Sequence, residues 1–179
     1  MKIIKYISKI LNRISLIGKF VHLYRIKKAK QILKKIKEIN AIPNNGGRVI
    51  NYLRKINPYV FEELVLSVIE NSNVRVIRNK SYSNDGGIDG IFKLSKGKVL
   101  VQCKRYKSYI NPKDVMQLSQ TVKEQKYYFG IFVHTGKTGE KSKDNIKIEN
   151  NTMIISGSLL INFLVGNSKI IDLIEKKNR

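Results

Sequence analysis

The sequence has few of the features that mark a disulfide-stabilised, secreted or membrane-spanning protein. Among its 179 residues there is one cysteine, Cys103, so no internal disulfide can form. No segment reaches the ~18–20 consecutive apolar residues of a membrane-spanning helix, and the best candidate, from Ile14 to Tyr24, is interrupted by Lys19. No small-residue cleavage site follows an apolar block near the start of the chain. We therefore expect a cytoplasmic protein.

Residues that bind transition metals are also scarce. The two histidines, His22 and His134, are far apart in sequence and have no metal-ligand spacing. The chain therefore shows no zinc pattern, and a histidine-based nuclease is a poor fit. Because the lone Cys103 lies in an apolar segment, we interpret it as a small core residue.

Acidic residues are few relative to basic ones. Lys and Arg number 35 against 13 Asp and Glu, which gives a formal net charge of +22 and a pI of about 10.1. Such a field attracts polyanions, with nucleic acid the first candidate and an anionic membrane the second. Residues 1–60 hold 15 basic side chains and one acid, Glu38, for a net charge of +14, whereas residues 61–179 carry +8. The length suits one domain with an extension.

The first 40 residues have the periodicity of a long amphipathic helix. Apolar residues recur every three or four positions from Ile3 to Tyr24 and again from Ile26 to Ile39, with Lys and Arg on the other faces. This pattern suits a surface helix packed on the body of the protein. It suits equally well a helix that dimerises or binds an anionic surface.

A turn signal follows this helix and sets a predicted boundary. Residues 41–48 include Pro43 and the run Asn-Asn-Gly-Gly. We predict a basic helical arm and linker over residues 1–45, a main domain over residues 49–170 and a basic tail over residues 171–179.

The main domain alternates helical and extended patterns, which predicts a layered α/β fold. Asn57-Pro58 is typical of a helix start, and Asn111-Pro112 of another. The predicted strands cover residues 74–77, 88–94, 98–105, 128–134 and 152–155, and the predicted helices cover residues 58–71, 111–125, part of 135–151, and 156–165.

One pair of segments carries the chemistry. Asp89 lies in the run Asp-Gly-Gly-Ile-Asp-Gly, and Gln102 and Lys104 follow in Val-Gln-Cys-Lys. Side chains alternate along a strand, so Gln102 and Lys104 project from the same face. Phosphodiester hydrolysis needs charge neutralisation and a positioned hydroxide, and Mg²⁺ prefers oxygen ligands. Asp89 can supply an anionic ligand, Gln102 an amide oxygen, and Lys104 a cation that orients water or stabilises charge.

Three motifs together resemble the Mrr-type restriction endonuclease domain of the PD-(D/E)xK nuclease superfamily. They are Asn57 to Val65, Asp85 to Gly90 and Val101 to Tyr106, and residues 129–133 and 153–160 extend the likeness. The resemblance covers about residues 55–165. It implies a restriction-endonuclease-like core, with a central mixed β-sheet flanked by helices and preceded by the basic helical extension.

The resemblance also implies the roles of individual residues. Asp89 matches the metal-binding Asp, Gln102 the position where this branch uses Gln, and Lys104 the catalytic Lys. Glu62 matches the acid on the first helix of the domain, with Glu63 as the neighbouring alternative. The predicted metal ligands are therefore Asp89, Gln102 and Glu62. Asp85 stands before Gly-Gly, which is more typical of a turn former than of a ligand.

Two classes of function remain open at this stage. The first is a Mg²⁺-dependent DNA endonuclease of the restriction or genome-defence type, in which Mn²⁺ can substitute and which cleaves DNA as a homodimer. The second is a non-catalytic DNA-binding module of the same fold. The complete set of Asp, Gln-x-Lys and Glu favours the enzyme. A membrane-surface protein is a weaker third class, supported only by the basic amphipathic arm.

Overall fold

A computed structural model describes residues 2–78, 87–166 and 169–176, with side chains from residue 18 onward. Five strands form one sheet in the order β1-β2-β3-β4-β5. β1 to β3 pair antiparallel, whereas β3 to β5 pair parallel. The strands are β1 (Val76–Arg78), β2 (Gly90–Leu94), β3 (Gly97–Lys104), β4 (Phe129–His134) and β5 (Thr152–Ile155).

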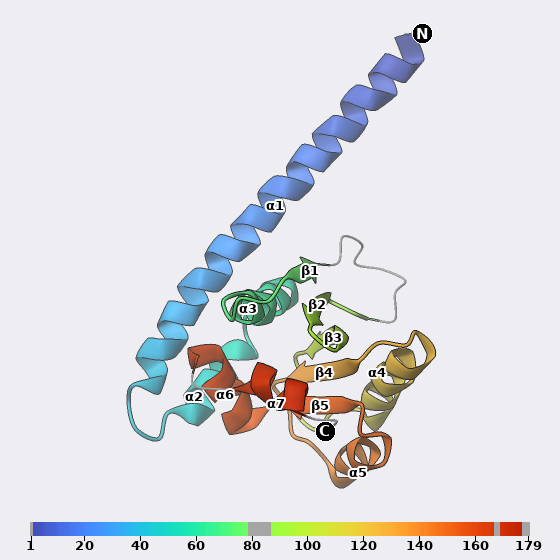
Figure 1. Cartoon of the computed structure of the whole chain (residues 1–179). Helices are drawn as coiled ribbons and strands as arrows, with labels where there is room; N and C mark the ends of the chain where they lie inside the picture. Colours follow the sequence, from blue (N-terminus) through green and yellow to red (C-terminus); the bar gives the residue numbers. More distant parts are fainter. Residues whose placement is uncertain (1, 79–86, 167–168, 177–179) are drawn as a thin grey trace.

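Helices cover both faces of this sheet (Figure 1). On one side, α2, α3, α6 and α7 share a hydrophobic core with the sheet, and α1 packs on α3, α6 and α2; α4 and α5 lie on the other side. The helices are α1 (Lys2–Asn40), α2 (Gly46–Leu53), α3 (Pro58–Glu70), α4 (Pro112–Glu124), α5 (Glu140–Glu149), α6 (Gly157–Val165) and α7 (Ile170–Lys176). The result is a three-layer α/β/α arrangement around a mixed sheet, which confirms the predicted fold class.

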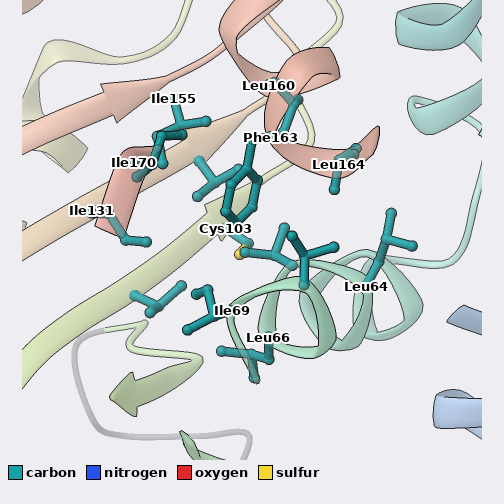
Figure 2. Close-up of a cluster of buried hydrophobic side chains, with 14 of the residues drawn as sticks. Leu64, Leu66, Ile69, Cys103, Ile131, Ile155, Leu160, Phe163, Leu164 and Ile170 are labelled. Carbon is teal, nitrogen blue, oxygen red and sulfur yellow. The ribbon is translucent and has the colours of Figure 1, made fainter. Parts of the chain in front are cut away.

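The two central strands are buried on both faces. Every residue of β4 is buried, and so are five consecutive residues of β3. On the α3 side, Cys103 of β3 lies among leucines and isoleucines of α3 and α6 (Figure 2). Cys103 is 8% exposed, as expected for a core residue. Strands covered on both faces read as continuous apolar runs, which is why the pattern of this sequence located them.

The long first helix packs on the body through its C-terminal half. Ala29, Ile32 and Ile36 are buried in the main core, at the spacing of one helix face. The packed-helix interpretation therefore holds for this half of α1. Val21 and Tyr24, which belong to the predicted apolar stripe, are 42% and 63% exposed. The N-terminal half of α1 extends away from the body (Figure 1).

Two helices differ from the sequence-based prediction. α2 begins within the predicted turn segment, residues 41–48, and continues into the start of the main domain, where no helix was predicted and where it buries Val49 and Leu53. α7 occupies most of the expected tail, because Ile170 and Ile174, four residues apart, both enter the core. Turn residues near α2 and lysines near α7 led to a prediction without helices in these segments. The apolar residues that pack into the core make both segments helical. The division into arm, domain and tail stays a prediction.

Within the described residues, no single helix is long and apolar enough to cross a membrane, and α6 and α7 meet that length and composition only as a bent pair.

Candidate active site

Asp89 is fixed against β3 immediately before β2 begins. Its backbone N–H donates to the carbonyl of Val101 at 2.9 Å, and its carboxylate Oδ2 accepts from the backbone N–H of Cys103 at 2.6 Å. These two bonds place the Asp89 side chain beside the residue between them, Gln102. A carboxylate that accepts a short bond from a backbone amide is held in one orientation, as a metal ligand needs to be.

Gln102 and Lys104 project toward the loop that precedes Asp89. A methyl group at Gly87 would lie 2.6 Å from Gln102 Nε2 and 3.8 Å from Lys104 Nζ. Gly87 also has φ of +77°, a conformation that favours glycine. This glycine is therefore needed for close approach of the backbone to the Gln-x-Lys pair. Gln102 is 3% exposed and Lys104 is partly buried, so the pair does not lie on an open strand surface.

Glu62 approaches the same place from α3. The helix begins after Asn57, whose side chain accepts from the backbone N–H of Tyr59 at 3.0 Å, with Pro58 in its first turn. Burial, and then the negative charge of Asp89, raise the pKa of Glu62 to about 8, although Arg25, Lys104 and Arg105 oppose the rise. The structure thus brings Glu62, Asp89 and Lys104 into one electrostatic neighbourhood.

The residues present fit a hard divalent cation better than a zinc ion. The described residues contain no cluster of three His, Cys, Asp or Glu side chains able to hold a metal. Two carboxylates, Glu62 and Asp89, instead share a site with the amide of Gln102. The mutual repulsion of the carboxylates would be relieved by a cation, and a few oxygen ligands supplemented by water are typical of Mg²⁺.

Glu63, the alternative helix acid, has a different environment. It is 5% exposed and accepts from Arg78 Nε at 2.8 Å and from Ser67 Oγ at 3.3 Å. His22 Nδ1 of α1 lies 3.6 Å from its other oxygen. These partners tie α3 to β1 and α1, so Glu63 is a structural residue and Glu62 remains the candidate ligand. Asp85 lies outside the described residues.

Partly buried arginines and a buried histidine connect the segments that follow β3 and β4. Arg105 donates to the carbonyl of Arg54 at 3.0 Å, and Arg54 donates twice to the carbonyl of Thr135, at 3.0 and 2.8 Å. Arg105 therefore joins the end of β3 to the α2–α3 connection. Burial lowers the pKa of His134 to about 4, so this imidazole is neutral and orders the loop after β4 through Gly136 N–H, at 3.1 Å.

The sequence did not indicate Arg25 as part of this neighbourhood. It lies on α1, far from Glu62 along the chain, and its guanidinium stands 4.5 Å from the ring centroid of Tyr59. Its charge acts on the pKa of Glu62. The helical periodicity of α1 placed Arg25 among the polar positions, but no local signal could specify which helix it faces.

The fold is restriction-endonuclease-like. Asp89 precedes the second strand of a mixed sheet, and Gln102 and Lys104 lie at the end of the third. Two solved restriction endonucleases have a similar fold. The restriction endonuclease MspJI, solved with a 27-mer oligonucleotide, matches with a TM-score of 0.53 and 18% identity, over 76% of this chain and 36% of its own. The DNA modification-dependent restriction endonuclease AspBHI matches with a TM-score of 0.54 and 17% identity, over 74% of this chain and 39% of its own. At these identities the likeness shows the fold alone.

The family follows from the sequence match. The model of the restriction endonuclease family, Mrr catalytic type, matches residues 53–164, and this chain belongs to that family. The type IV methyl-directed restriction enzyme EcoKMrr of Escherichia coli (strain K12) is 25% identical over 144 residues, which are 76% of this chain and 46% of that enzyme. The chain thus spans about half the length of the curated relative. The predicted Mrr-type resemblance is confirmed. Restriction endonucleases of this kind generally require divalent metal ions.

Proposed function

We propose that this protein is a metal-dependent DNA endonuclease of the restriction or genome-defence type, which hydrolyses phosphodiester bonds. The observation that carries the proposal is the meeting of Glu62, Asp89 and Lys104 at the C-terminal end of β3. Two partly buried carboxylates beside a lysine are expensive for a fold unless a cation and an anionic substrate use them. Family membership and the net charge of +22 support DNA as that substrate.

Asp89, Glu62 and the Gln102 amide oxygen would hold Mg²⁺, for which Mn²⁺ would substitute. The bound ion supplies neutralising charge at the phosphate and lowers the pKa of a coordinated water. The hydrogen bond from Cys103 N–H keeps the Asp89 carboxylate oriented for this role. Because the pKa of Glu62 is about 8, loading the site also requires this carboxyl to release its proton.

Lys104, the last residue of β3, and Arg105, which follows it, are two of the cations whose charge acts on the pKa of Glu62. We assign Lys104 the reactive role: its ammonium donates to a phosphate oxygen or orients the attacking water, and so stabilises the charge that develops in the transition state. Arg105 is held by the Arg54 carbonyl and contributes a fixed positive charge. The buried Gln102 excludes water beneath the reacting phosphate.

The test is cleavage of supercoiled plasmid with Mg²⁺, with Mn²⁺ and with EDTA. Asp89→Ala and Lys104→Ala should each lower the nicking rate by roughly a hundredfold or more, and EDTA should abolish nicking. Lys98→Ala is the matched control for Lys104, since Lys98 is an exposed lysine on the same strand. Asp144→Ala, on the exposed face of α5, is the control for Asp89. Metal-independent nicking, or equal rates in all four variants, would reject the site.

Retained salt-sensitive DNA binding without cleavage of any plasmid, methylated plasmid included, would instead identify a non-catalytic DNA-binding module. The proposal also includes a cytoplasmic location. It includes a homodimer as well, because two nuclease sites related by a two-fold axis most simply cut both strands of a duplex. Light scattering of the protein with and without a duplex oligonucleotide tests the dimer, and a monomer under both conditions would remove it.

A further inference from the structure

A pocket of about 280 Å³ lies where α1 crosses the start of α3. This volume is at the low end of the ~300–1,000 Å³ found for pockets that hold drug-sized ligands, so it suits one nucleotide unit rather than a large cofactor. Its lining comes from α1, the end of α2, the α2–α3 connection and α3, and it includes Tyr24, Arg25, Lys28, Tyr52 and Tyr59. We call it the α1–α3 pocket.

Cations and tyrosines alternate around this pocket. Arg25 is stacked over Tyr59, 4.5 Å from the ring centroid, which holds its guanidinium in one place. Lys28 is exposed and lies one turn further along α1. None of the described residues that line the pocket is acidic. An anion that enters the pocket therefore meets two positive charges and no acidic lining residue.

The α1–α3 pocket adjoins the candidate active site through α3. Tyr59 and Glu62 are three residues apart and so lie on the same side of that helix, about 4.5 Å apart along its axis. Arg25 connects the two places, because it contacts Tyr59 and its charge acts on the pKa of Glu62. α1 itself lies outside residues 53–164, which match the family model.

Tyr24 supplies the feature that phosphate binding alone would not need. Its side chain lines the pocket and is 63% exposed, although an aromatic ring is usually among the most buried on a helix that packs against a core. A basic surface with an exposed aromatic ring beside it is the arrangement with which proteins hold unpaired nucleotides. Tyr59 already stacks against Arg25, and Tyr52 against Lys35. Tyr24 is more exposed than Tyr59, at 63% against 38%, and is therefore the ring best placed to stack on a base.

We propose that the α1–α3 pocket binds one unpaired nucleotide of the DNA strand that enters the active site, with its phosphate on Arg25 and Lys28 and its base stacked on Tyr24. This inference rests on the proposed function, since it takes DNA as the substrate. It assigns α1 a part in substrate binding beyond the general attraction of a basic helix.

Base stacking is tested with a short single-stranded oligonucleotide that carries one 2-aminopurine, titrated in EDTA so that no cleavage occurs. Binding to the wild-type protein should quench the 2-aminopurine fluorescence. Tyr24→Ala should abolish the quench and weaken binding about tenfold, while Tyr24→Phe, which keeps the ring, should behave as wild type. Leu23→Ala is the matched control, because Leu23 is 60% exposed on the same helix and does not line the pocket.

Phosphate contact is tested by the salt dependence of the same binding. Arg25→Ala should reduce the slope of log K against log salt concentration by about one, whereas Arg25→Lys should restore it. Lys34→Ala removes one exposed charge from α1 outside the pocket and should leave the slope unchanged. Equal slopes for Arg25→Ala and Lys34→Ala, or equal quenching by Tyr24→Ala and wild type, would overturn the proposal.

The failure of this proposal is distinguishable from failure of the proposed function. Plasmid nicking measures metal-dependent chemistry, whereas the oligonucleotide titration in EDTA measures binding alone. A protein that nicks plasmid but shows no difference between Tyr24→Ala and Leu23→Ala keeps the nuclease assignment and loses the nucleotide site. A protein that never nicks plasmid but loses quenching in Tyr24→Ala loses the nuclease assignment and keeps the nucleotide site.

Discussion

Two neighbouring glutamates on α3 have opposite surroundings. Glu63 is matched by Arg78, Ser67 and His22, which join α3 to β1 and α1. Glu62, one residue earlier, faces Asp89 and has its pKa raised to about 8 by burial and by that second negative charge. The same side chain therefore stabilises the fold as a charged group at one position, whereas at the next its ionised form is disfavoured. A carboxyl with such a raised pKa is typical of a site that serves a ligand rather than stability.

Of the substitutions that test the difference between Glu62 and Glu63, the one with the largest expected effect changes the rate of DNA cleavage. Glu62→Gln keeps the shape of the side chain and removes the anionic oxygen, so metal-dependent nicking should fall by roughly a hundredfold or more. Glu63→Gln should nick plasmid at close to the wild-type rate at a temperature where it is folded. Single-turnover nicking at saturating Mg²⁺ compares the two variants. Equal losses in both would show that α3 contributes no specific ligand.

A second prediction concerns the pH dependence of metal binding. Because the pKa of Glu62 is about 8 without metal, an ion must displace its proton at lower pH. The apparent affinity for Mg²⁺ should therefore rise about tenfold per pH unit up to about pH 8 and level off above it. Calorimetry with the protein alone measures this, and a flat profile between pH 6 and 8 would exclude Glu62 as a ligand.

The raised pKa of Glu62 also predicts how the free energy of unfolding changes with pH in EDTA. A carboxyl whose pKa is higher in the folded state than in the unfolded one loses stability as the pH rises from about 4.5 to about 8. Glu62→Gln should remove this loss and raise the midpoint of thermal unfolding at pH 8, whereas wild type and variant should converge below pH 4.5. A variant that is less stable than wild type at pH 8 would contradict this interpretation of Glu62.

The smallest expected effect is the loss of stability that follows substitution of Glu63. Glu63→Gln weakens a buried acceptor of Arg78 and Ser67, which should lower the free energy of unfolding by about 1–3 kcal/mol. For a chain of this length each 1 kcal/mol corresponds to about 2–4 °C in the unfolding midpoint. Thermal unfolding in EDTA measures the loss. The exposed pair of Lys143 and Glu140 on α5 provides the control, because Glu140→Gln should change little.

Periodicity and short-range motifs were sufficient for the strands and for half of the site. β3 and β4 are apolar runs bounded by turns, and the alternation along β3 already placed Gln102 and Lys104 on one face. The close approach of Gly87 to Gln102 could not be predicted from the sequence, because it joins residues of two different segments. Such contacts need the paired register of β2 and β3, which the sequence does not state.

The remaining differences come from long-range packing. Arg25 and Arg78 meet α3 from segments that are far away in the chain, so neither the pairing of Glu63 nor the cation beside Glu62 could be read from local patterns. α2 and α7 are short and contain turn residues or lysines, and their helical state depends on apolar residues that dock into an existing core, such as Leu53 and Ile174. Tertiary packing outweighs intrinsic propensity in such segments.

The packing of α1 on α3 has a consequence for any transfer of the family-matched region, residues 53–164, into another protein. Residues 53–164 mark the family match, yet the back of the helix that carries Glu62 is covered by Ala29, Ile32 and Ile36, which precede that range. A fusion protein that began at residue 53 would expose this apolar surface of α3 to solvent, and we expect it to aggregate. The smallest part of this chain that keeps its core covered therefore begins within α1, upstream of the residues that match the family model.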